Sequence, residues 1–284
     1  MVARRILLLA FCLGLAAAAL AADPAARRTD ELMRKSGLWQ QVGLAQSQVI
    51  AAIEESRERD RGPGRQPLTG PEAERIQGAA RVAFSPERMR AFVRADMERL
   101  LSAEDEAEVL VWLSSPLGTR FTRLEEESDE PANYARMQRE APKYASGLPP
   151  ERMARFARLE KDIQGGEGAV EMTINIAIAV AYGVASASAT LDPADVEKLR
   201  ARFAGQRASM LEVLTRQMVE SFAWIYRSMS DDELDRYADF AETAAGRKYH
   251  AASMKALTNA FVRASLDMGE RVGRAEREEP RRGL

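Results

Sequence analysis

Apolar residues recur at spacings of three and four along most of the chain, and no convincing stretch alternates apolar and polar positions with a period of two. A spacing of three and four places apolar side chains on one face of an α-helix. Gly and Pro fall mostly at the boundaries between such segments. The pattern therefore predicts an all-α protein.

Several of the expected helices carry capping residues at their starts. Ser85 and Asp192 are each followed by proline, which loses no hydrogen bond at the first helical position because the N–H there has no helical partner. Ser230 begins a capping box, and Ser102 begins a close relative of one. These starts predict helices over residues 86–101, 103–115, 193–205 and 231–244.

A pattern recurs in two parts of the chain that lie 128 positions apart. Residues 102–121 align without a gap with residues 230–249, and the two segments share a capping serine, the phase of the apolar positions, an aromatic side chain and a glycine. A weaker match at the same offset links residues 42–50 with 170–178. We therefore expect two tandem helical repeats of roughly 128 residues packed into a helical bundle array, with a small insertion between the matched blocks.

The first of these segments also carries a recognisable motif. A capped helix start is followed by Trp112 and then by Ser115, Pro116 and Gly118, with a basic residue two positions later. This pattern resembles the domain of unknown function 2059 family of exported bacterial helical proteins, in two tandem copies. Only one member of the family's aromatic pair is present, no basic residue directly follows the first glycine, and the second segment keeps Gly246 but lacks Ser-Pro. The resemblance implies an exported all-helical protein, and it brings no catalytic residues because the family has no established activity.

The motif has a physical interpretation that is independent of the family. Ser-Pro at a helix boundary caps and begins the next helix, and a glycine allows two helix backbones to approach closely. We expect Trp112 and Phe240 on the buried faces of their helices, and we expect a packed helical hairpin rather than a ligand site. The residues to which we assign this structural role are Ser102, Trp112, Ser115, Pro116, Gly118, Phe121, Ser230, Phe240, Gly246 and Tyr249.

The N-terminus is typical of a secretory signal peptide. Two arginines precede an uncharged apolar stretch, and small residues then favour cleavage after Ala21 or Ala22. The alternative is an uncleaved membrane anchor, although the apolar stretch is short for a bilayer span. The only cysteine, Cys12, lies inside this segment, so the mature chain would have neither a disulfide nor a thiol nucleophile. We expect a periplasmic protein.

The expected organisation of the whole chain follows from these observations. It is a signal peptide over residues 1–22, a first helical repeat over 23–147, a second helical repeat over 148–275, and a disordered tail over 276–284. Residues 172–191 carry no charge and approach the length of a membrane span. Acidic residues flank this segment. Its counterpart in the first half of the chain is amphipathic, so we expect a buried core helix and no stable membrane span after signal cleavage.

Composition narrows the classes of function. The chain of 284 residues has 41 basic and 43 acidic side chains, a balance that argues against a nucleic-acid partner. One Cys and one His exclude Cys-rich zinc modules and most His-dependent catalysis. No phosphate-binding loop, nucleophile elbow or zinc-protease motif is present. We therefore predict no catalytic residue, no cofactor and no metal site.

Two further features favour simple structural interpretations. His250 follows Arg247 and Lys248, whose charges should lower its basicity, and we expect it at the surface or in an interface. The acidic residues 125–130 lack the spacing of a calcium loop and predict a solvated helix end.

Three functions remain open. The leading one is a non-enzymatic protein that acts by interaction, with an envelope protein or an apolar ligand as its partner. The second is a carrier of lipids or other apolar small molecules, and the third is a hydrolase with an unrecognised carboxylate site. An exposed apolar groove would favour the first, a cavity larger than a few hundred cubic ångströms the second, and two converging carboxylates of raised pKa the third.

Overall fold

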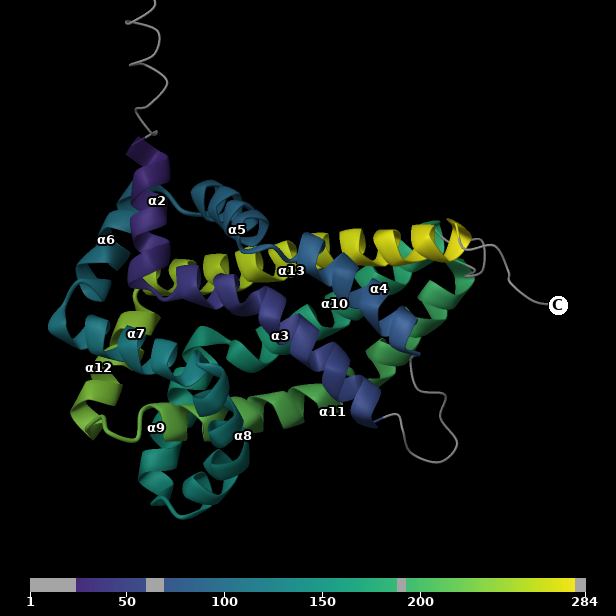
Figure 1. Ribbon diagram of the computed structural model, residues 1–284. Coiled ribbons are helices and arrows are strands. Elements are labelled where there is room, and N and C mark those ends of the chain that lie inside the picture. Colours follow the sequence, from purple (N-terminus) through teal and green to yellow (C-terminus); the bar gives the residue numbers. More distant parts are fainter. Residues whose placement is uncertain (1–23, 60–68, 188–192, 279–284) are drawn as a thin grey trace, which may run out of the picture.

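The structure is a computed structural model that describes residues 24–59, 69–187 and 193–278, and every element of regular secondary structure among them is an α-helix (Figure 1). The prediction of an all-α protein is confirmed. The expected signal peptide, its cleavage at Ala21 or Ala22 and the helix cap at Asp192 lie outside the described residues. The helices are α2 (Pro24–Lys35), α3 (Leu38–Arg59), α4 (Gly70–Ala83), α5 (Pro86–Leu100), α6 (Ala103–Leu113), α7 (Pro116–Asp129), α8 (Pro131–Ser146), α9 (Pro150–Ile163), α10 (Gly165–Ala187), α11 (Pro193–Ile225), α12 (Asp231–Glu242) and α13 (Ala244–Glu278).

The helices form one packed body around a continuous apolar core. The long helices α10, α11 and α13 pack together, while α2, α6, α7, α9 and α12 gather at one end (Figure 1). Helices α4 and α5 pack against α13, and α8 packs against α11, so each half of the chain contacts the other along most of its length.

The helix starts are only partly as expected. Segments 86–101, 103–115 and 231–244 correspond to α5, α6 and α12, and both capping boxes are present. The fourth segment, 193–205, is only the beginning of α11. Ser85 occupies the N-cap of α5 but makes no side-chain hydrogen bond there, so the hydroxyl cap expected from the sequence is wrong.

Two prolines in the first half of the chain begin new helices where the second half has none. Pro86 begins α5 just after α4, and Pro131 begins α8 just after α7. The residues 128 positions later are Leu214 and Asn259, and both lie inside unbroken helices. Proline lacks an N–H and clashes with the preceding turn, so it ends a helix that leucine or asparagine would continue. This difference accounts for the length of α11 and α13.

The offset of 128 positions extends beyond the two aligned segments. Shifted by 128 positions, α3 covers residues 166–187, where α10 spans Gly165–Ala187, and α6 falls on α12. Helix α3, before residues 60–68, and helix α6, after them, have the same offset from their counterparts in the second half. The correspondence therefore requires no net insertion between the matched blocks, contrary to the expectation from the sequence.

The two turns that carry the motif glycines are built alike. Ser115 Oγ accepts a hydrogen bond from the N–H of Gly118 at 3.0 Å, and Thr243 Oγ1 accepts one from the N–H of Gly246 at 2.9 Å. Threonine therefore replaces serine as the cap in the second hairpin. The two connections, from α6 to α7 and from α12 to α13, have the same local hydrogen bonding although only one contains Ser-Pro.

Alanine at Gly118 or Gly246 is expected to destabilise the protein by about 1–3 kcal/mol, the usual cost of overpacking. An added Cβ would lie 2.2 Å and 2.0 Å, respectively, from the carbonyl oxygen of the residue six positions earlier. At Gly78 and Gly205, inside α4 and α11, it would meet nothing within 4 Å, so alanine there should stabilise by about 0.5–1 kcal/mol. Urea titration of the four variants measures both effects, and a similar loss at all four positions would contradict the explanation.

Equivalent aromatic residues of the two hairpins pack against each other. Trp112 of α6 stacks on Phe240 of α12, with ring centroids 4.7 Å apart and planes inclined by 7°. Tyr237 lies beside Trp112 at 6.1 Å. Phe240 is buried and Trp112 is half-buried against the same core.

Ion pairs between the hairpins are reciprocal. Arg120 of α7 pairs with Glu233 of α12. Lys248, the residue 128 positions after Arg120, pairs with Asp105, the residue 128 positions before Glu233, at 2.7 Å. The ion pair from the first hairpin to the second is thus matched by an equivalent ion pair from the second hairpin to the first. Contacts across a two-fold axis are arranged in this way.

Helix α10 contains most of the segment expected to form a buried core helix. Among the described residues it is the one helix that is long and apolar enough to cross a membrane by length and composition. It packs against α13 and α11, and its isoleucine and valine side chains are buried or half-buried. The helix also keeps a solvent-facing edge, so it is not buried all round. The exposed residues are Glu167, Glu171, Thr173, Asn175, Tyr182 and Ser186.

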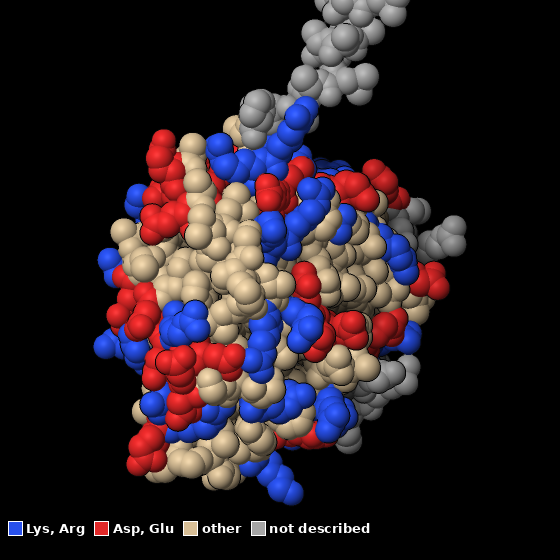
Figure 2. All heavy atoms as spheres, turned by 90° about the vertical axis from the view of Figure 1, so that its left-hand side faces the viewer, with Lys and Arg blue, Asp and Glu red and all other residues tan. Residues whose placement is uncertain are grey.

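Charges of both signs are interspersed on the face that Figure 2 shows. Charged side chains also pair between neighbouring helices, as in the contact between α9 and α12. Arg155 pairs with Asp235 at 3.2 Å and Arg158 with Asp239 at 2.9 Å. Such exposed pairs stabilise each helix contact weakly.

Candidate functional site

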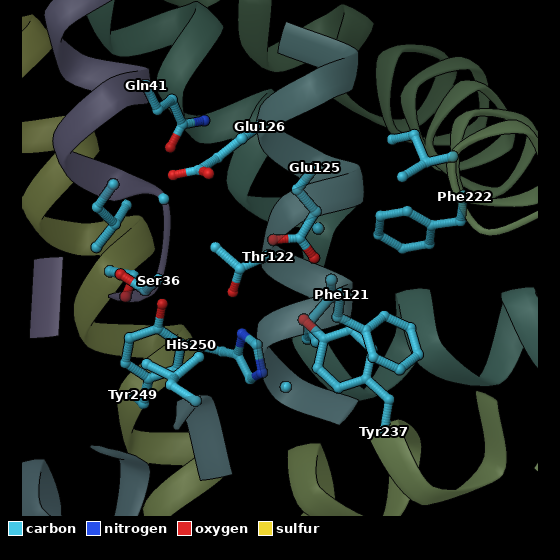
Figure 3. Close-up of a pocket in the computed structure, with 18 of the residues that line it drawn as sticks. Ser36, Gln41, Phe121, Thr122, Glu125, Glu126, Phe222, Tyr237, Tyr249 and His250 are labelled. Atoms are coloured by element: carbon cyan, nitrogen blue, oxygen red, sulfur yellow. The ribbon is translucent and has the colours of Figure 1, made fainter. Parts of the chain in front are cut away.

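A pocket of about 270 Å³ lies between α7 and the first turns of α13 (Figure 3). The turn after α2, helices α6 and α12, and the last turns of α11 close its sides. Figure 3 shows Thr122, Glu125 and His250 around its middle, with Tyr249 on one side and Phe222 on the other. The described residues that line the pocket include three carboxylates and seven aromatic rings, but no lysine and no arginine.

The carboxylates come from one end of one helix. Glu125, Glu126 and Asp129 lie in the last two turns of α7, which carries no basic residue in its last turn. The C-terminal end of a helix has partial negative charge, so carboxylates there are unfavourable. The sequence of α7 therefore places negative charge at a helix end that repels it. No lysine or arginine of the pocket lining compensates for this charge.

Enclosure by the pocket makes these carboxylates hard to ionise. Burial raises the pKa of Glu125 to about 7, and the neighbouring Asp129 contributes further. The hydroxyl of Tyr226 donates a hydrogen bond to Glu125 at 2.5 Å, which favours ionisation but does not offset burial. Burial and the charge of Glu126 raise the pKa of Asp129 to about 6. The pKa of Glu126 is also raised by burial. These groups retain protons at a pH where ordinary carboxyl groups have lost them.

His250 faces the same pocket from α13. Its Nε2 is buried and has no hydrogen-bond partner among the described residues. Burial lowers the pKa of the imidazole to about 4, so the ring is neutral at pH 7. The ring packs against Tyr249 and lies 6.2 Å from Tyr237 and Phe240 between centroids. A buried ring nitrogen without a partner is unusual in a folded protein and offers a bonding position to a ligand.

Three tyrosines complete the polar lining. Tyr226, Tyr237 and Tyr249 are buried, and burial is the largest cause of the raised pKa of each phenol. The pKa of Tyr249 rises to about 12. All three therefore stay neutral and present hydroxyl groups and ring faces to the pocket.

The structure corrects two expectations about charged and polar residues. His250 was expected at the surface or in an interface, but it lies in a pocket inside the chain, and burial rather than neighbouring cations lowers its pKa. The acidic segment 125–130 was expected to be a solvated helix end, but Glu125 and Asp129 point into the pocket. One sequence signal was available: the last turn of α7 concentrates acidic residues without a compensating base.

The motif residues build the two helical hairpins, and some of them also border the pocket. The helical hairpins that they build are present, with Ser102, Ser115 and Ser230 as caps and Pro116 as a first helical residue. Five of them also line the pocket. They are Trp112, Gly118, Phe121, Phe240 and Tyr249.

A second, shallower hollow of about 410 Å³ lies on the outside of α10 and α11. Met210, Val213 and Leu214 supply its apolar part, and no charged residue lines it. Thr173, Gln206 and Ser209 supply its polar part, and the hollow is compatible with the exposed groove expected of an interaction protein. Within the described residues no group of three His, Cys, Asp or Glu side chains has the arrangement of a metal site.

Comparisons with protein-family models, curated proteins and solved structures found no match for this chain. The pocket is therefore interpreted from its own chemistry.

Proposed function

We propose that this protein is a non-enzymatic binding protein whose pocket takes a small organic cation. The observation that carries the proposal is the lining itself: three carboxylates on α7, aromatic rings around them, and neither lysine nor arginine among the lining residues. A desolvated carboxylate must be neutralised either by a proton or by a cation. The raised pKa values of Glu125 and Asp129 indicate that protons neutralise them when no cation is bound.

An organic ammonium group would replace those protons. Its N–H groups can donate to Glu125 and Asp129, and Nε2 of His250 supplies a further acceptor in its suitable tautomer. Aromatic faces such as those of Trp112 and Tyr237 attract cations, and they do so more strongly when water is excluded. Binding should therefore release protons near pH 7.

Calorimetric titration with butylammonium, with butyrate and butanol as comparison probes, tests the proposal at pH 8. We expect butylammonium alone to bind. In a second titration near pH 7, proton release should make the measured binding enthalpy depend on the ionisation enthalpy of the buffer. Glu125→Gln should weaken binding about tenfold or more, because it removes a charge-assisted hydrogen bond. Glu127→Gln is the matched control, since Glu127 lies on the exposed side of α7. Absence of butylammonium binding, or equal binding of butyrate, would contradict the proposal.

Export to the periplasm is part of the proposal. It is supported by the arginines, apolar stretch and small residues of the segment 1–22, and by the resemblance to the domain of unknown function 2059 family. N-terminal sequencing of the protein from a periplasmic fraction should begin at Ala22 or Asp23, and a retained Met1 would contradict signal cleavage.

We also propose that the two halves arose by internal duplication. The constant offset of the helices, the matching turns at Gly118 and Gly246, and the reciprocal ion pairs support this. Superposition of residues 28–145 on 150–275 provides the measurement, and different helix directions in the two halves would leave the correspondence as a coincidence.

A hydrolase is the second candidate, because Glu125 and Asp129 share one pocket and both have raised pKa values. Such an enzyme should hydrolyse chromogenic esters or glycosides, and Glu125→Gln should abolish the turnover. Absence of turnover in the unmodified protein would favour the binding function.

The pocket volume of about 270 Å³ lies below the range typical of drug-sized ligands, which favours a small ligand over a lipid.

A further inference from the structure

The two walls of the pocket are equivalent stretches of the chain. At five positions a residue of α7 lines the pocket and so does the residue 128 positions later on α13. The pairs are Phe121 with Tyr249, Thr122 with His250, Glu125 with Ser253, Glu126 with Met254, and Asp129 with Leu257. The pocket therefore lies where the two hairpins face each other, on the approximate two-fold axis that their reciprocal contacts define.

The chemistry of the two walls differs at the last three of these positions. On α7 all three residues carry a carboxyl group. On α13 their equivalents are the hydroxyl of Ser253, the thioether of Met254 and the alkyl group of Leu257. Met218 and Phe222 of α11 also line the pocket and add further apolar surface. One wall thus attracts a positive charge and the opposite wall favours an apolar group.

Glycine in α10 helps to keep the apolar wall in place. Gly168 is buried against Met254, and a Cβ there would lie 2.6 Å from the Met254 side chain. The absence of a side chain at this position leaves room for Met254 beside the pocket. The apolar wall is therefore packed from behind.

We infer that the ligand is an amphipathic monoamine, with its ammonium group on the α7 wall and a short apolar body along the α13 wall. The inference rests on the proposed cation-binding function and adds the shape and polarity of the ligand. The volume of about 270 Å³ admits a short alkyl or single-ring body. Each methylene group that the apolar wall removes from water should strengthen binding about fourfold.

The first experiment measures the Kd of methylammonium, propylammonium and pentylammonium by calorimetric titration at pH 8. In the unmodified protein we expect the affinity to rise about fourfold per methylene group until the pocket is full. Affinity that is independent of chain length would overturn the inference while leaving the cation-binding function intact. Absence of binding by all three amines would instead contradict the proposed function.

The second experiment places on α13 the side chain that α7 carries at the equivalent position. Met254→Glu should remove the dependence on alkyl length and make 1,5-pentanediamine bind more tightly than pentylammonium, reversing the order in the unmodified protein. Met254→Gln should weaken the alkyl dependence without favouring the diamine. Val111→Glu, at a side chain that is 74% exposed, adds the same charge away from the pocket and should change neither order.

Circular dichroism establishes that each variant keeps its helical content. A folded Met254→Glu variant that still prefers pentylammonium over the diamine would overturn the inference. If that variant does not fold, Met254→Gln and the amine series in the unmodified protein still test the inference. An affinity of Met254→Gln that depends on alkyl length as strongly as that of the unmodified protein would contradict the proposed apolar wall.

Discussion

Glu125→Gln is expected to stabilise the folded protein by about 3 kcal/mol at pH 8 and to have almost no effect at pH 4. Burial holds the pKa of Glu125 near 7 in the folded state, against an ordinary value of 4.5. The folded state therefore binds the proton more tightly than the unfolded state does. Stability is lost as pH rises above 4.5, and the loss is complete above pH 7. Glutamine carries no charge and avoids this loss.

Urea titration of both proteins at pH 4, 6 and 8 measures the effect. The groups around Glu125 are Asp129, Glu126 and the phenols of Tyr226 and Tyr237, and they are present in both proteins. His250 acts in the opposite direction, since its lowered pKa makes stability fall as pH drops from 6.5 toward 4, but this contribution cancels in the difference. A difference that stays constant between pH 4 and pH 8 would show that Glu125 is solvated in solution.

A carboxylate that lowers the stability of its own fold fits a functional role, because sites that bind or react often trade stability for function. Glutamine would keep an oxygen that accepts from Tyr226 and would remove the cost of burying a charge. The retained acid is therefore consistent with the proposed role in binding a cation. The same variant should gain stability and lose affinity, and this opposite movement separates a binding role from a structural one.

Trp112→Ala is expected to destabilise the protein by about 2–3 kcal/mol, less than the usual cost of truncating a fully buried large aromatic side chain, because the ring is half-buried. Trp112 joins the two hairpins, because its ring stacks on Phe240 at 4.7 Å and lies beside Tyr237. The variant would lose this burial together with the aromatic contact. It would also leave a cavity at the wall of the pocket.

Denaturant titration measures this loss, and Val111→Ala is the matched control. Val111 precedes Trp112 on α6 and is 74% exposed, so its truncation should change the free energy of unfolding by less than about 0.5 kcal/mol. A loss below about 1 kcal/mol for Trp112→Ala would mean that the ring does not hold the hairpins together.

Local signals in the sequence predicted some of the helices, whereas α4, with a capping box at Thr69, and α8, which begins at Pro131, were not predicted although they carry signals of the same kind. The capping boxes at Ser102 and Ser230 placed α6 and α12, and the recurring glycines identified the two hairpins. The extent of α11 was not predicted, because the expectation stopped at residue 205 although no proline ends the helix there. These outcomes depend on chemistry within a few residues of each helix end.

The pocket could not be predicted in the same way, because its walls meet only in the folded chain. Glu125 and Asp129 occupy a helix end that is acidic throughout, and only the position of α13 opposite them distinguishes these half-buried carboxylates from exposed Glu127. His250 stands among cations in the sequence, yet its ring turns inward. The offset of 128 positions held the missing information, since it pairs the acidic positions of one segment with Ser253, Met254 and Leu257 of the other.

The placement of both pocket walls in one chain has a consequence for how the site can change. Two identical subunits around a two-fold axis would carry every substitution twice, and a carboxylate that is useful on one wall would also appear on the other. Here each wall has its own codons. A mutation at Glu126 leaves Met254 unchanged. The charge of the α7 wall and the apolar character of the α13 wall can therefore be altered separately.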